Sequence, residues 1–188
     1  MSVAGIQSIK QWAIAAVGTL LAMPVVAMEV ETHGGTLSAD TVWKADAIHK
    51  VTSTITVPSG ITLTVEPGAI VKFNSGQALN VNGVLDATGT EENNIIFTSY
   101  RDDIGGDTNG DGPSVGQPGD WYRVYFGDSV VDNFTKLEHS RIRFGGSQYS
   151  GRQNESVYLD RANITISNSE IVDGFWNGLY IYNSHPLV

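Results

Sequence analysis

The chain has 188 residues, of which 41% are hydrophobic and 9% aromatic, and its formal net charge is −9 at pH 7. This composition is typical of an ordered globular protein of about one domain and excludes a disordered chain. The acidic balance argues against nucleic acids and anionic lipid surfaces as partners. The chain has no cysteine. A disulfide framework is therefore excluded, and stability must come from burial, backbone hydrogen bonds or bound metal.

Residues 1–27 are organised differently from the rest of the chain. One lysine precedes an apolar run, and Pro24–Ala27 forms a small-residue cleavage site. This pattern predicts a secretory signal peptide cut after Ala27. The alternative is a membrane anchor, because the apolar run Trp12–Met28 has 17 residues, at the low edge for spanning a bilayer. Cleavage leaves ten basic and 20 acidic residues, a net charge of −10. We expect a secreted protein, extracellular or at the cell surface or else periplasmic, with no membrane span after signal cleavage.

Residues 28–50 are expected to form an N-terminal entry or cap segment. After them the chain repeats one pattern, a short apolar alternation ended by glycine, asparagine, aspartate or proline. Strands of three to five residues with turn residues at their ends predict an all-β protein. The expected strands are Ile61–Val65, Ile70–Phe73, Leu79–Val81, Val84–Leu85, Ile95–Thr98, Trp121–Phe126, Ile142–Phe144, Val157–Leu159, Ile164–Ile166 and Leu179–Ile181.

Two spacings favour stacked coils over a hairpin sandwich. Leu63, Leu79 and Ile95 are each 16 residues apart. A polar residue followed by serine also recurs at turns, at intervals of 29 and 15 residues. Stacked coils repeat a turn because each coil presents the same corner to the next. A β-sandwich or jelly roll with coincidental spacing is the alternative. The three copies of the turn are His139–Ser140, Asn168–Ser169 and Asn183–Ser184.

The segment VTSTITVPSGITLTVEPGAIVKF, Val51–Phe73, resembles the opening coils of the right-handed parallel β-helix proteins of the pectate-lyase-like superfamily, found among secreted bacterial surface proteins. Further matches are Gly83–Thr90, Ile95–Ser99 and Gly119–Trp121, and the resemblance covers roughly residues 40–185. It implies a parallel β-helix over residues 51–188. It implies no single activity, because that superfamily includes lyases, hydrolases and adhesins.

The end of the sequence departs from that family. Such domains usually have more coils and a cap over the open edge. Here the sequence stops directly after an expected strand. We therefore expect this chain to be truncated at its C-terminus, the N-terminal portion of a larger protein.

The stretch GGDTNGDG, residues 105–112, stands in an acidic loop insertion at 100–120. Asp107, Asn109 and Asp111, followed by Gly112, match the first half of an EF-hand calcium loop. The twelfth position is Pro118 instead of glutamate, and no helix is expected on either side. An EF-hand is therefore excluded, while a different calcium loop is not.

Calcium needs six to eight oxygen ligands, so further carboxylates are required. Asp103 and Asp120 are the candidates, with Asp102 as another. The alternative is a solvated excursion that needs no ligand. In the β-helix proteins that the chain resembles, a similar insertion recurs between the counterparts of Thr98–Ser99 and Gly119–Trp121. We predict a structural Ca²⁺ bound by Asp107, Asn109, Asp111, Asp103 and Asp120.

The evidence for catalysis is weaker. The resemblance implies either a lyase, with a basic proton acceptor and calcium, or a hydrolase with clustered aspartates. Arg141 and Arg143 flank Ile142 and are expected to point outward, either as an anionic-sugar-binding pair or as a solvated strand face. No catalytic residue is predicted. The four histidines are scattered along the sequence, which argues against a transition-metal site; they are His33, His49, His139 and His185.

Aromatic residues gather in the second half of the chain. Outward-facing aromatic rings stack on sugars, whereas inward-facing ones fill the core. We expect a calcium-stabilised scaffold that contacts polysaccharide or another cell-surface component, or acts in adhesion. The alternative is a polysaccharide lyase or glycoside hydrolase whose active face lies on coils partly outside this chain. The aromatic residues are Trp121, Tyr122, Tyr125, Tyr149, Tyr158, Phe175, Trp176, Tyr180 and Tyr182.

Overall fold

A computed structural model describes residues 28–146 and 155–188. The predicted signal peptide, residues 1–27, and Tyr149 lie outside the described residues. The described chain consists of 15 strands and one short 3-10 helix, η1 (Asp132–Phe134). Within these two ranges there is no helix long and apolar enough to cross a membrane.

Every strand pairs in parallel, in two sheets. The larger sheet has the order β14-β11-β8-β5-β3-β6-β9-β12-β15, with β1 on β3, and the smaller has the order β13-β10-β7-β4-β2. The larger sheet comprises β1 (Glu29–Thr36), β3 (Ala47–Val57), β5 (Ile70–Phe73), β6 (Leu79–Val81), β8 (Ile95–Ser99), β9 (Val124–Phe126), β11 (Ser140–Arg143), β12 (Val157–Asp160), β14 (Glu170–Val172) and β15 (Leu179–Tyr182). The smaller comprises β2 (Thr41–Trp43), β4 (Thr62–Val65), β7 (Val84–Thr88), β10 (Lys136–Glu138) and β13 (Thr165–Ser167).

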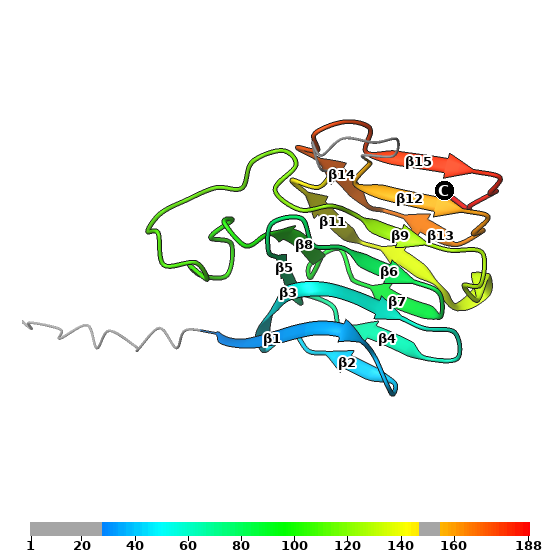
Figure 1. Ribbon diagram of the computed structural model, residues 1–188, viewed down its shortest axis with the longest axis horizontal. Helices are drawn as coiled ribbons and strands as arrows, with labels where there is room; N and C mark the ends of the chain where they lie inside the picture. The colour runs from blue at the N-terminus through cyan, green and yellow to red at the C-terminus, as the bar shows by residue number, and fades with distance from the viewer. Residues whose placement is uncertain (1–27, 147–154) are drawn as a thin grey trace, which may run out of the picture.

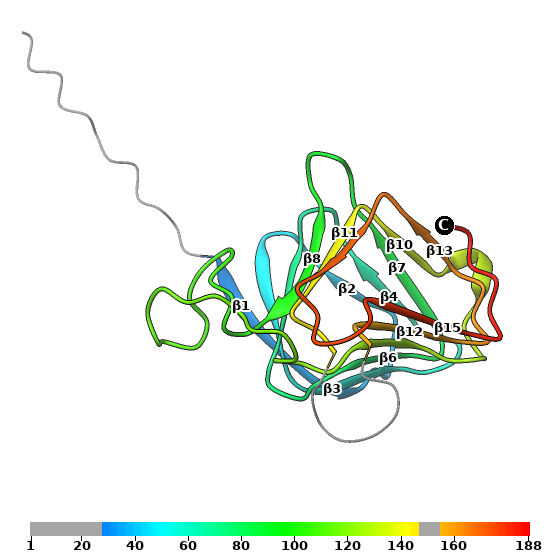
Figure 2. The same cartoon turned by 90° about the horizontal axis from the view of Figure 1, so that it is seen from above.

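The long strand β3 turns the larger sheet into two faces. Its first half pairs with β5, through Ile48–Ile70, and its second half pairs with β6, through Ile55–Leu79. With the smaller sheet these make three faces around a common core (Figure 2). Side chains such as Val51, Phe73 and Leu85 are fully buried there. The predicted all-β parallel β-helix is thereby confirmed.

One coil of the solenoid is longer than the 16-residue spacing found in the sequence. Leu63 of β4 pairs with Thr41 and with Leu85, which lie 22 residues before and after it. Leu79 and Ile95 lie on β6 and β8, on the other two faces. The 16-residue spacing therefore joins every second strand along the chain, from β4 to β6 to β8, and does not relate stacked residues.

The polar-serine turn does repeat between stacked coils. The Ser169 hydroxyl accepts a hydrogen bond from the Ser140 backbone N–H at 3.0 Å. His139 and Asn168, just before them, both adopt positive φ, 45° and 48°. These two copies form one corner on adjacent coils. The left-handed conformation there redirects the chain from the smaller sheet to β11 and β14.

The third copy lies at a different corner. The Ser184 hydroxyl accepts from the Ala162 N–H at 2.9 Å, and Asn183 stacks on Arg161, with positive φ at both, 47° and 55°. At both corners, therefore, a serine hydroxyl accepts a backbone N–H from the adjacent coil, directly after a residue with positive φ. The 15-residue interval joins two corners rather than two coils.

The N-terminal segment 28–50 contains regular strands. It holds β1, β2 and the start of β3, and β1 pairs with β3 in parallel, with Glu31 opposite His49. The outer side of β1 is exposed, and Figure 1 shows β1 and β2 at one end of the stack. This segment therefore forms the first layer of the solenoid.

Candidate functional site

The acidic loop leaves the solenoid after β8 and returns before β9, extending beyond the strands in Figures 1 and 2. Its return is fixed by Trp121, whose ring stacks on Phe73 with 4.2 Å between ring centroids and 9° between planes. The indole N–H donates to the Arg143 carbonyl at 2.7 Å. Both rings are fully buried. The loop is thereby attached to the core at its C-terminal end.

Two lysines hold the loop backbone from below. Lys50 of β3 and Lys72 of β5 are neighbours in register. The Lys50 ammonium donates to the Thr108 carbonyl at 2.6 Å, and the Lys72 ammonium to the Gly106 carbonyl at 2.5 Å. Lys72 is fully buried. Desolvation lowers the pKa of Lys72, and the loop aspartates oppose this shift.

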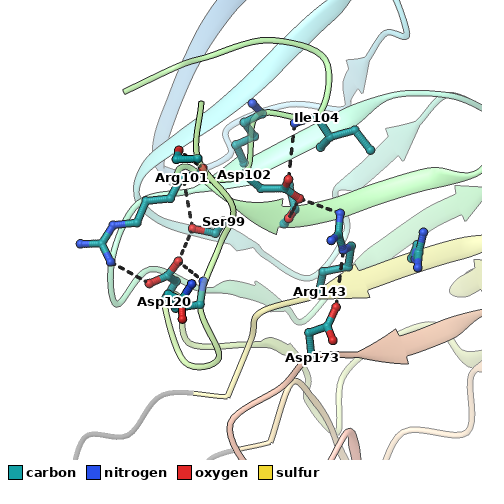
Figure 3. A network of polar contacts seen from close by, with 12 residues as sticks. Ser99, Arg101, Asp102, Ile104, Asp120, Arg143 and Asp173 are labelled. Carbon is teal, nitrogen blue, oxygen red and sulfur yellow. Dashed lines mark hydrogen bonds and ion pairs between the residues drawn. The ribbon is translucent and has the colours of Figure 1, made fainter. Parts of the chain in front are cut away.

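Asp102 belongs to the base of the loop. Its carboxylate accepts hydrogen bonds from the Thr98 hydroxyl at 2.6 Å and from the Arg143 guanidinium at 2.9 Å (Figure 3). The Asp102 side chain is 7% exposed and that of Arg143 is 17% exposed. The guanidinium also lies 3.9 Å from Asp173. Asp102 is therefore the counterion of a mostly buried arginine.

Asp120 lies in the same basal network. One carboxylate oxygen accepts from the Ser99 hydroxyl at 2.7 Å and from the Gln117 N–H at 2.8 Å. The other accepts from the Arg101 guanidinium at 3.1 Å (Figure 3). The Asp120 side chain is 8% exposed. Asp120, a predicted calcium ligand, therefore joins the two ends of the loop at its base, together with Asp102. It does not belong to the acidic cluster formed by Asp103, Asp107 and Asp111.

The other predicted acidic ligands do come together. Asp103, Asp107 and Asp111 each place a carboxylate oxygen within 4.8 Å of the others. We call this set the tip carboxylates. Gly112 has φ of 80°, a conformation that glycine adopts without strain, as the sequence pattern required. The first half of the calcium-loop motif therefore folds into a turn that gathers carboxylates.

Backbone N–H groups organise this turn. Asp107 accepts hydrogen bonds from the Gly110 N–H at 2.7 Å, the Asn109 N–H at 3.0 Å and the Gly112 N–H at 3.1 Å. These bonds, led by that from Gly110, lower the pKa of the exposed Asp107 carboxyl. Asp107 is consequently a carboxylate, and its oxygens retain lone pairs for a further partner.

Asn109 and Asp103 complete the tip. The Asn109 amide donates to Asp111 at 2.7 Å, while its oxygen faces the Asp111 N–H at 3.5 Å. Asp103 Oδ2 accepts from the Ser114 N–H at 2.6 Å. Asp103 Oδ1 is buried and has no hydrogen-bond partner among the described residues. A buried, unpaired carboxylate oxygen beside two other carboxylates suits a hard, oxygen-seeking cation.

Arg141 and Arg143, considered from the sequence either as a sugar-binding pair or as a solvated strand face, have two different roles. Arg141 forms an exposed ion pair with Glu170 at 3.1 Å. Arg143 is committed to Asp102. Both side chains flank the buried Ile142 and point away from the core, as expected, but each guanidinium already has a carboxylate partner.

The aromatic residues likewise divide between core and surface. Tyr125, Tyr158 and Tyr180 form a row across β9, β12 and β15, with ring centroids 5.4 and 5.2 Å apart. Trp121 fills the core. Of the aromatic residues named from the sequence, the exposed ones among the described residues are Phe175 at 41%, Trp176 at 65%, Tyr180 at 38% and Tyr182 at 46%.

Two of the four histidines are not scattered. His33 Nε2 lies 2.9 Å from His49 Nδ1, which corrects the expectation that no imidazoles meet. Desolvation and the neighbouring His49 lower the pKa of His33. Glu31 and His33 lie two residues apart in the sequence, which puts two possible metal ligands on one side of a strand. Their partner could not be identified without the pairing of β1 with β3.

Comparisons with known proteins assign no family. No protein-family model matches the chain, and no solved structure matches it. An 87-residue stretch is 30% identical to Protein bark beetle of Drosophila melanogaster, covering 46% of this chain and 3% of that protein. The chain thus spans only a small part of the length of the curated relative that it matches.

Proposed function

We propose that this protein is a secreted β-helix scaffold, extracellular or at the cell surface, with a loop at 100–120 that binds one structural Ca²⁺. The ligands are the tip carboxylates of Asp103, Asp107 and Asp111, with Asn109 beside them. The observation that carries the proposal is the convergence of these three carboxylates, one of which, that of Asp103, also has a buried oxygen without a hydrogen-bond partner among the described residues.

The charges of the loop support a cation at its tip. Among the described ion pairs, the loop arginine Arg101 and its neighbour Arg143 pair with Asp120 and Asp102, and none involves the tip carboxylates. The two lysines below the loop donate to its backbone carbonyls. Three carboxylates within 4.8 Å repel one another unless positive charge lies between them. Carboxylate, amide and carbonyl oxygens on a sharply turning backbone are the ligands that Ca²⁺ prefers.

The exposed aromatic residues support contact with carbohydrate. Trp176, Tyr180 and Tyr182 lie on or beside the outer strand β15 and are exposed. Flat rings of this kind stack on the apolar faces of sugars. The parallel solenoid supplies a rigid, extended surface for such contacts, as repeat folds do. Polysaccharide or another cell-surface component is the partner that this surface fits.

Calcium is tested by thermal unfolding. Millimolar Ca²⁺ should raise the melting temperature of the wild type, because a ligand that binds only the folded state stabilises it. Asp107→Ala with Asp111→Ala should abolish the rise. A matched control is Glu91→Ala with Glu92→Ala, which removes the same charge from another exposed turn and should leave the rise intact. No calcium-dependent shift in the wild type would overturn the metal proposal.

Carbohydrate contact is tested with acidic and neutral polysaccharides. Binding should weaken in Trp176→Ala and stay unchanged in Phe134→Ala, an equally exposed aromatic at 67% on η1. Equal binding by both variants would remove the aromatic surface from the proposal. Release of unsaturated sugar products on incubation would replace the scaffold by the lyase alternative.

A further inference from the structure

The first two strands of the larger sheet bring three ligating side chains to one point. β1 pairs with β3 in parallel, and Glu31 stands directly opposite His49. Glu31 and His33 are two residues apart on β1, so both side chains leave the same side of the strand. This group lies on the first layer of the solenoid and is separate from the acidic loop.

The ligand atoms lie at metal-site distances. His33 Nε2 is 2.9 Å from His49 Nδ1. Glu31 Oε2 is 3.5 Å from His49 Nδ1 and 3.7 Å from His33 Nε2. Around a tetrahedral ion with bonds of about 2.0–2.1 Å, ligand atoms stand about 3.4 Å apart. Movements of a few tenths of an ångström therefore convert the present arrangement into a coordination shell.

A backbone carbonyl sets the tautomer of His49. His49 Nε2 lies 2.8 Å from the Lys44 carbonyl oxygen, which can only accept, so Nε2 carries the proton. His49 Nδ1 is then left with a free lone pair that faces His33 and Glu31. Orientation of a ligating imidazole by a hydrogen bond to its other nitrogen is a regular feature of metal sites. In the metal-free chain His33 Nε2 donates to that lone pair, and metal binding would move this proton to His33 Nδ1.

Trp43 fixes the two imidazoles from one side. Its ring stacks on His49, with 5.4 Å between centroids and 14° between planes, and lies 4.9 Å from the His33 ring. Trp43 is fully buried and His49 is 1% exposed. His33 is 20% and Glu31 50% exposed. The nitrogen ligands are thus held rigidly, while the carboxylate side opens to water.

We propose that Glu31, His33 and His49 bind one divalent transition-metal ion of the zinc class. Two imidazoles and one carboxylate are ligands for Zn²⁺, Ni²⁺ or Cu²⁺, whereas Ca²⁺ prefers oxygen alone. Three protein ligands with one open side leave a position for water. Because the ligands come from two strands, the metal ties β1 to β3 at the end of the stack.

The test is calorimetric titration of the untagged protein with Zn²⁺ in buffer containing millimolar Ca²⁺, which keeps the acidic loop occupied. The wild type should bind one Zn²⁺ per chain. His33→Gln and Glu31→Gln should each weaken binding more than about tenfold, since loss of even an outer partner of a metal ligand costs that much. His185→Gln, which alters an exposed histidine outside the group, should bind as the wild type does.

A second measurement keeps the proposal separate from folding and from the calcium loop. Co²⁺ in place of Zn²⁺ should give a visible absorption band in the wild type and in Asp107→Ala/Asp111→Ala. The band should be lost in Glu31→Gln, whose half-exposed side chain is not needed for folding. Zn²⁺ binding that persists unchanged in His33→Gln, or no binding by the wild type, would overturn the proposal, whatever the outcome for calcium.

Discussion

The base and the tip of the acidic loop contain the same kind of residue in different settings. At the base, Asp102 and Asp120 are 7% and 8% exposed and each pairs with an arginine. At the tip, Asp107 and Asp111 are exposed and accept from the loop's own N–H groups. The base joins the loop to the solenoid through buried side chains, whereas the tip is held by local turns and by Lys50 and Lys72, which donate to its backbone. Carboxylates at the base are structural counterions, and those at the tip remain available to a ligand.

The difference shows what decides the role of an aspartate in such a loop. Spacing within the loop gathers Asp107 and Asp111, because a turn is a local structure. The partners of the basal aspartates come from elsewhere in the chain: Arg143 stands 41 residues from Asp102. Asp120 is held by Ser99 at the end of β8 and by Arg101, 21 and 19 residues before it, and so lies outside the cluster of tip carboxylates.

The largest effect is expected from Trp121→Ala, which removes the basal anchor from the core. Truncation of a fully buried tryptophan should lower the free energy of unfolding by about 3–5 kcal/mol. The matched control is Trp176→Ala, since Trp176 is 65% exposed and its loss should change stability by less than about 0.5 kcal/mol. Urea unfolding measures both. If the base supports the tip, Trp121→Ala also weakens Ca²⁺ binding; unchanged Ca²⁺ affinity would make the two regions independent.

A smaller effect is expected from Arg143→Met, compared with Arg141→Met on the same strand. The first leaves the mostly buried Asp102 carboxylate without its cation and should destabilise by about 2–4 kcal/mol, below the full penalty because the pair is partly exposed. The second breaks an exposed pair with Glu170 and should change stability by less than about 1 kcal/mol. Chemical denaturation of both variants measures the two losses in the free energy of unfolding. Equal losses would show that burial does not separate the two arginines.

Local features of the fold could be predicted from the sequence, and long-range ones could not. The bounds of β5 and β6 were predicted to the residue, because turn residues mark both ends of each apolar alternation. The strands β1, β2, β3, β10 and β14 were not among those expected. The number of residues in a coil could not be read from the sequence, because loops of unequal length separate stacked strands: Leu79 pairs with Val124, across the acidic loop. The meeting of His33 with His49 depends on the register of β1 against β3, which no local pattern encodes.

The smallest effect is expected at the tip, from Asp107→Asn in buffer containing a calcium chelator. The pKa of Asp107 is lowered by N–H donors, so the folded chain binds the proton more weakly than the unfolded chain does. The stabilisation is fully present above the ordinary aspartate value of 3.8 and is lost as the pH falls through the lowered pKa. The melting temperature of Asp107→Asn should therefore lie slightly below that of the wild type near neutral pH, by less than in either basal variant, and the two should converge on acidification. Asp46→Asn, at another exposed aspartate, serves as the control for a general loss of one charge. A difference that stays constant with pH would mean that the carboxylate charge at the tip does not stabilise the turn.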